Sequence, residues 1–292
     1  APPTHPPPPT APAPPPPRPT RQAGRMVFET KVFGNDALEK LNEKTYLCPT
    51  GKYLAYVPAK VYGVVNGGLR NLSAVIEYMP SDLRQTIEQG LDSLGTTVEV
   101  LDKIEGDLTL AVLPMQKFRN TQIPQFFAAV ECKDSGLFDR VVDKIKHENP
   151  TMTTVANRVY ALGLAKTSDE DDYYLAYLQN TIFLLPASLY GQLADGDRFK
   201  ALAENFTQNP LASMFNQKSG LVVDFQTIAE DMERMGNRGI VAGYYLRMLK
   251  DLIVKQVDNM TGEGTLNFTD SETNALKQIT DVLTRAIGGY LR

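Results

Sequence analysis

Histidine is the residue type that decides which nucleophilic mechanisms this sequence could support. The chain has two, His5 in a proline-rich start and His147 in the segment KIKHENP. A Ser-His-Asp or Cys-His mechanism needs a positioned imidazole as its base, so it would have to use His147. This residue falls in the last turn of a predicted polar-faced helix, where a cation complements the helix dipole. We therefore interpret His147 as a solvated helix-end residue.

Glycines with the spacing of a phosphate-binding loop occur in GVVNGG (63–68), where an extended run meets a predicted helix. A P-loop continues with Lys and then Ser or Thr, which reach the phosphates and Mg²⁺. Here Leu69 and Arg70 follow instead. We interpret the segment as a turn with Asn66-Gly67 at positive φ, and we predict no nucleotide site.

Carboxylates gather in DEDD (169–172), which could hold Ca²⁺ but lacks the alternating ligands and central Gly of an EF-hand loop. We interpret this segment as the solvated tip of a hairpin. A glycosidase needs two carboxylates that face each other across a cleft. A carboxylate-dependent hydrolase acting on glycans therefore stays the alternative function.

The two cysteines, Cys48 and Cys132, are too few for a zinc site even with the one histidine of the fold. They would form a disulfide if their extended runs are neighbours, and otherwise they are unpaired core or edge residues. The sequence thus predicts no catalytic residue, no cofactor-binding residue, no metal ligand and no cofactor.

Tyrosines form two groups that could line a sugar-binding or partner-binding surface. The first comprises Tyr173, Tyr174 and Tyr177, and the second is the pair Tyr244 and Tyr245. Aromatic side chains on strands and helices more often belong to the core. We therefore expect both groups to be core residues.

Composition is that of a globular protein, with 42% hydrophobic and 22% charged residues. No run approaches the roughly 18 apolar residues that span a bilayer. The net charge of −4 includes three arginines and no acid in residues 1–25, which leaves −7 for the remainder. An acidic body argues against nucleic acid as partner, because phosphate binding needs clustered Lys and Arg. The start at Ala1 without a signal peptide indicates a mature or excised form.

Residues 1–25 form a proline-rich segment, with 12 of the 20 prolines in residues 1–20. Proline fixes φ and removes backbone donors, so we predict a disordered polyproline II tether. The segment PPRPTR (16–21) also fits the PxxPxR pattern of SH3 ligands. A spacer that holds a domain off a surface is the simpler interpretation.

A strand–helices–strand–strand–helix pattern occurs twice, which predicts an α+β fold of two similar units with mostly antiparallel sheets and helices packed on them. The first unit, 26–150, contains an extended run at 52–63, helices at 67–79 and 81–94, strands at 108–114 and 124–132, and a helix at 136–147. The range 151–292 holds a β-rich middle, with a hairpin turn at Asn180-Thr181, and the second unit. The two ranges could also form one compact domain.

The second unit begins with the run 219–232, which leads into helical sequence. It continues with strands at 251–260 and 264–270 and a helix at 271–287. Helices are also predicted at 35–44, 194–206 and 209–216. Thr269 and Glu272 have capping-box spacing before the final helix. The apolar positions of that helix follow the helical period and predict one buried face; they are Leu276, Ile279, Val282, Leu283 and Ile287.

Three stretches resemble a family of uncharacterised envelope lipoproteins from Bacteroidetes, domain of unknown function 4836. They are YLAYVPAKVYGVVNGGLRNL (53–72), IEGDLTLAVLP with IPQFFAAVECKDSGLFDRVVDKI (104–145), and NPLASMFNQKSGLVVDFQTIAEDM (209–232) with GTLNFTDSETNALKQI (264–279). The resemblance covers most of 46–290 and not the proline-rich start. It implies a lipid-anchored or secreted protein of the cell envelope, periplasmic or surface-exposed, and it implies no known reaction.

These observations predict a non-enzymatic cell-envelope protein, lipoprotein-like, that binds or scaffolds an unknown protein or glycan. Membrane contact would come only through a lipid anchor outside this chain. The hydrolase predicts two facing carboxylates in a deep cleft, at least one with a raised pKa. A binding protein predicts a shallow surface with an exposed apolar or tyrosine patch. A third hypothesis is a peptide binder that uses an unpaired strand.

Overall fold

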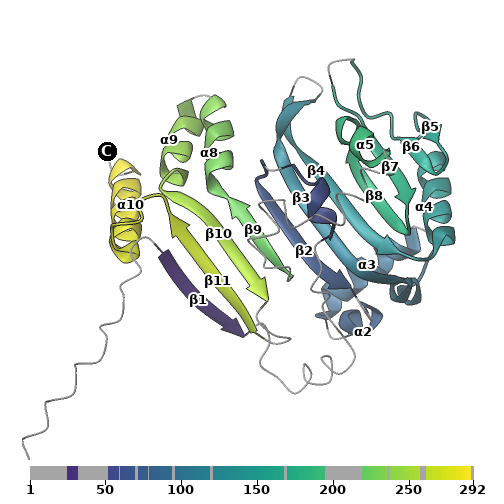
Figure 1. Ribbon diagram of the computed structural model, residues 1–292, viewed down its shortest axis with the longest axis horizontal. Coiled ribbons are helices and arrows are strands. Elements are labelled where there is room, and N and C mark those ends of the chain that lie inside the picture. Colours follow the sequence, from purple (N-terminus) through teal and green to yellow (C-terminus); the bar gives the residue numbers. More distant parts are fainter. Residues whose placement is uncertain are drawn as a thin grey trace, which may run out of the picture.

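A computed structural model describes residues 25–31, 52–58, 60–69, 72–77, 79–93, 96–118, 121–167, 170–194, 219–235, 237–256 and 261–290. The strands of these residues form one eleven-stranded sheet in the order β1-β11-β10-β9-β2-β3-β4-β8-β7-β6-β5 (Figure 1). Every neighbouring pair in this order is antiparallel. The predicted α+β fold with a mostly antiparallel sheet is confirmed.

One half of the sheet comes from residues 63–194. Its elements are β2 (Gly63–Leu69), α2 (Leu72–Glu77), α3 (Ser81–Ser93), the 3-10 helix η2 (Val98–Lys103), β3 (Ile104–Phe118), β4 (Thr121–Cys132), α4 (Ser135–Glu148), β5 (Thr153–Ala156), β6 (Val159–Ala161), β7 (Tyr173–Leu178), β8 (Thr181–Pro186) and α5 (Ala187–Ala194). The strands predicted at 108–114 and 124–132 and the helix at 136–147 are confirmed. The predicted hairpin is β7–β8, but its two-residue turn is Gln179-Asn180, at φ of 48° and 60°, rather than Asn180-Thr181, because Thr181 already pairs with Leu178.

The other half contains the later part of the chain and one strand from near its start. Its elements are β9 (Gly220–Asp224), α8 (Phe225–Arg234), α9 (Asn237–Leu246), β10 (Leu249–Gln256), β11 (Thr261–Phe268), α10 (Ala275–Tyr290) and β1 (Arg25–Lys31). Asp224 begins α8, because its side chain accepts hydrogen bonds from the backbone N–H groups of Gln226 and Thr227. The chain therefore turns from strand to helix without a loop, as the run 219–232 predicted.

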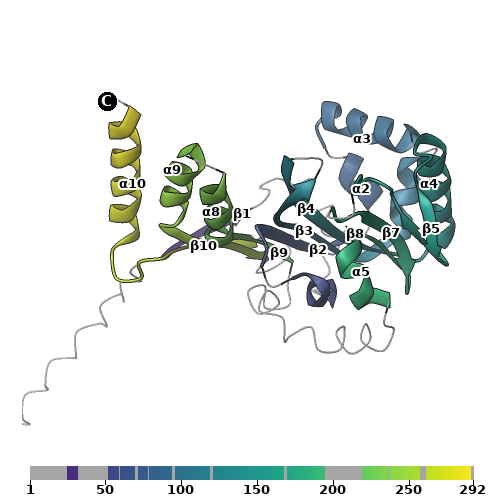
Figure 2. The same ribbon diagram turned by 90° about the horizontal axis from the view of Figure 1, so that it is seen from above.

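Helices lie on both faces of the sheet, but unequally. We call the face that carries α5 and the 3-10 helix η1 (Lys52–Tyr56) the front face, and the opposite face the back face. Figure 2 shows α2, α3, α4, α8, α9 and α10 on the back face. Because successive residues of a strand point to opposite faces, each strand of the sheet centre contributes to both layers.

The main core lies between the front face and η1. Tyr53 and Leu54 of η1 pack with Phe127 of β4, Phe183 of β8 and Val222 of β9, and all five are at most 3% exposed. On the back face, Ile76 of α2, Leu101 of η2 and Leu137 of α4 form a second cluster with Cys132. Phe138 and Val142 of α4 pack on Leu175 and Tyr177 of β7.

Three predicted elements start elsewhere than the sequence indicated. The prediction of an extended run at 52–63 is wrong, because the 3-10 helix η1 occupies its first part and β2 begins only at Gly63. The helix predicted at 67–79 begins only at Leu72, since β2 continues to Leu69 in pairing with β3. The final helix begins at Ala275 rather than 271, and Asp270 accepts the N–H groups of Glu272 and Thr273 in place of the predicted capping box.

The burial predicted for the final helix is wrong at its first apolar position. Leu276 is 70% exposed, while Ala275 and Gln278 are buried. The Gln278 side chain donates hydrogen bonds to the carbonyl oxygens of Asp270 and Thr273. These bonds fix the side of the helix that faces inward. The predicted tether 1–25 lies outside the described residues except for Arg25, which begins β1. Of the helix predicted at 194–206, only Ala194 is described, as the last residue of α5. Cys48 and the helices predicted at 35–44 and 209–216 lie outside the described residues.

The two halves join through the antiparallel pairing of β2 with β9, which places Val64 opposite Val222 and Val65 opposite Leu221. The backbone N–H of Asp224 also donates to the carbonyl oxygen of Tyr62, at 2.9 Å. Gly63 sits at this junction, where a Cβ atom would lie 3.0 Å from the carbonyl oxygen of Val222. The close approach of the two strands therefore favours glycine at position 63.

We expect Gly63→Ala to lower the free energy of unfolding by about 1–3 kcal/mol, because the new methyl group crowds the junction. Gly67→Ala is the matched control in the same strand, since its nearest neighbour would be Ser219 Oγ at 4.0 Å. The control should be neutral or stabilising by up to about 1 kcal/mol through the unfolded chain. Urea denaturation measures both, and equal losses in the two variants would contradict this role of Gly63.

Candidate functional site

The structure separates the residues that the sequence singled out for chemistry. His147 is exposed in the last turn of α4, as interpreted. The glycine segment lies within β2, so the predicted turn with positive φ is wrong. Asn66 is 2% exposed inside this strand, and its Oδ1 accepts a hydrogen bond from the Thr109 hydroxyl at 3.1 Å. The segment pairs with β3 along its whole length and with β9 over Gly63–Asn66, so it forms no loop that could surround a phosphate.

The acidic segment is a bonded loop rather than a solvated tip. Asp172 accepts the backbone N–H groups of Gly163 and Leu164 at 2.9 and 2.8 Å. Asp171 accepts the N–H of Ser188 at 3.0 Å, and Asp169 lies outside the described residues. The predicted solvated tip is therefore wrong for Asp171 and Asp172. Across the described parts of the chain, no group of three or more His, Cys, Asp or Glu could hold a metal ion.

The first tyrosine group belongs to the framework, as expected. Tyr177 is buried, and its hydroxyl donates to the carbonyl oxygen of Cys132 at 2.9 Å. The Tyr173 hydroxyl accepts the N–H of Phe126, and the Tyr174 ring lies 5.1 Å from that of Tyr190. The expectation is wrong for Tyr244 on α9, which is 54% exposed.

Cys132 is a buried free thiol beneath α4. Burial raises the pKa of this thiol above its usual value, which lowers its nucleophilicity at neutral pH because the thiolate is the reactive form. Its sulfur lies 3.6 Å from the carbonyl oxygen of Asp134. These surroundings are those of a packing residue. The proposed partner Cys48 is outside the described residues.

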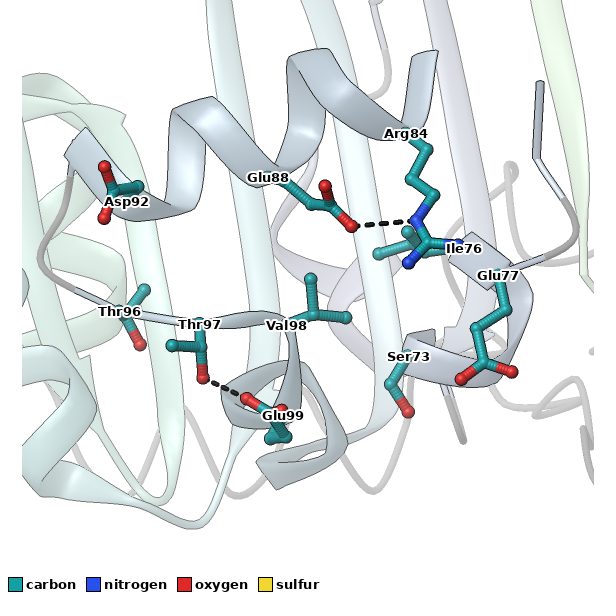
Figure 3. A pocket seen from close by; sticks show the side chains of 10 residues that line it. All are labelled: Ser73, Ile76, Glu77, Arg84, Glu88, Asp92, Thr96, Thr97, Val98 and Glu99. Atoms are coloured by element: carbon teal, nitrogen blue, oxygen red, sulfur yellow. Dashed lines mark hydrogen bonds and ion pairs between the residues drawn. The ribbon is translucent and has the colours of Figure 1, made fainter. Parts of the chain in front are cut away.

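A pocket of about 430 Å³ opens between α2, α3 and η2 (Figure 3). Its lining is acidic, with one base, and comprises Ser73, Ile76, Glu77, Arg84, Glu88, Asp92, Thr96, Thr97, Val98 and Glu99. Arg84 pairs with Glu88 at 2.8 Å. The hydrogen bond from the Thr97 hydroxyl lowers the pKa of Glu99, which is opposite to the raised pKa that a glycosidase acid needs.

A second candidate lies on the back face of the sheet centre, where apolar side chains are exposed on three adjacent strands. Val65 of β2 is 40% exposed, Leu110 of β3 is 43% exposed and Phe126 of β4 is 49% exposed. Val65 stands opposite Leu110, and Phe126 stands opposite Val112, in the register of the sheet. We call Val65, Leu110, Val112, Phe126 and Ala128 the apolar floor.

Helices stand on both sides of the apolar floor. Figure 2 shows α8 and α9 on one side and α2 and α3 on the other, while none of the described helices lies over β2 and β3 between them. The front face of the same strands is covered, since Val64, Ala111 and Phe127 are at most 2% exposed. The apolar floor is therefore an uncovered part of an otherwise two-sided core.

A buried polar cluster fixes α8 beside the apolar floor. The Tyr62 hydroxyl donates to Asp231 of α8, which is 4% exposed, and Arg234 pairs with the same carboxylate at 3.0 Å. The backbone N–H of Met115 in β3 donates to the Tyr62 hydroxyl at 3.1 Å and to Asp231 at 3.2 Å. Burial, followed by the bond to Asp231, raises the pKa of Tyr62. These contacts link a helix of one half to two segments of the other.

Comparison with family models, with curated proteins and with solved structures gave no match to this chain. The lipoprotein resemblance therefore stays a prediction from the three sequence stretches. Within the described residues, every helix is too short or too polar to cross a bilayer. The two surfaces above, the pocket and the apolar floor, are the features on which a function can be argued.

We expect Tyr62→Phe to lower the free energy of unfolding by about 1–3 kcal/mol at pH 7, because the buried carboxylate of Asp231 loses a donor. Tyr244→Phe, at an exposed tyrosine, should change it by less than about 0.5 kcal/mol. Urea denaturation of both variants provides the comparison.

Comparison of the wild type with Tyr62→Phe also predicts how the stability depends on pH. Because the folded-state pKa of Tyr62 is raised, its contribution is complete below pH about 10 and is lost as the pH rises above that value. The wild type should then lose more stability between pH about 9 and about 11 than Tyr62→Phe does. Parallel losses would show that Tyr62 ionises equally in both states.

Proposed function

We propose that this chain is a non-enzymatic, lipoprotein-like protein of the cell envelope that binds or scaffolds a partner through the apolar floor. The supporting observation is the exposure of Val65, Leu110 and Phe126 on adjacent strands in register. Contiguous exposed apolar surface is typical of interaction sites. A glycan presents both apolar and polar groups, and Tyr and Trp match it because their rings carry a hydrogen-bonding group. The apolar floor contains neither residue type, which favours a protein partner over a glycan.

The cell-envelope location rests on the sequence. The three stretches that resemble the envelope lipoprotein family extend through both halves of the sheet, and the proline-rich start fits a spacer between an anchor and a domain. The spacer would hold the apolar floor away from the membrane, where a partner protein can approach it.

A duplicated unit is part of the same proposal. The orders β2-α2-α3-β3-β4-α4 and β9-α8-α9-β10-β11-α10 correspond, except that the 3-10 helix η2 lies between α3 and β3 and has no counterpart between α9 and β10. The first strands of the two units, β2 and β9, pair antiparallel at the centre of the sheet, as an approximate two-fold axis would place them. In this proposal the apolar floor lies beside the axis, with one wall from each unit.

The test is a pull-down from cell-envelope extract with the full chain as bait. We expect a retained partner that the double variant Leu110→Ser with Phe126→Ser no longer holds, because both anchors of the apolar floor are lost. The matched control is Val155→Ser with Leu276→Ser, two apolar residues that are 45% and 70% exposed on β5 and α10. Equal retention by wild type, double variant and control would refute binding through the apolar floor.

A further inference from the structure

We draw no further inference here: the strongest candidate, the exposed apolar side of α9 formed by Ile240, Val241 and Tyr244, carries nothing because the neighbouring Arg234 and Arg247 are already paired with Asp231 and Glu233 of α8 and nothing in the structure shows what covers it.

Discussion

The pairing of β2 with β9 is the contact on which the rest of the structure depends. It joins two sets of strands into one sheet through the register that places Val64 opposite Val222. Gly63 permits the close approach of the backbones there, and the bond from Tyr62 to Asp231 ties the following helix to the same junction. Without this pairing the halves would separate, and the two walls would no longer face one apolar floor.

The central strands are packed on the front face, and this packing allows their back-face side chains to stay exposed. Val64, Ala111 and Phe127 bury their side chains under η1, so the central strands already have one complete apolar layer. Fully burying a Val, Leu or Phe side chain is worth about 1.5–3 kcal/mol, and the half-exposed Val65, Leu110 and Phe126 forgo part of that stabilisation in the isolated chain. A partner that covers them recovers it, which ties the driving force for binding to the unfilled part of the layer.

Sequence patterns correctly predicted the elements whose structure depends mainly on neighbouring residues. Continuous apolar runs bounded by turns identified β3 and β4, and helical periodicity identified α4. The segment at 52–57 was mistaken for a strand because Tyr53, Leu54, Tyr56 and Val57 are all buried against the sheet, a pattern that a strand buried on both faces also gives. The apolar floor had a faint signal in the same runs, since PQFFAAVEC lacks polar alternation. Its exposure depends on where α8 and α2 end up, which is tertiary information.

The centre of the sheet also explains why the proposed repeat shares a hydrophobic pattern but no motif of reactive residues. If each proposed unit carried its own site, similar residues would recur at matching positions, but His147 and GVVNGG occur in the first half of the sheet only. A surface formed where the two halves of the sheet meet needs no such repetition, because β2, β3 and β4 supply the floor and α8 stands beside it from the other half. A binding surface made of strand faces depends on packing between distant segments, so no short motif of reactive residues would announce it in the sequence.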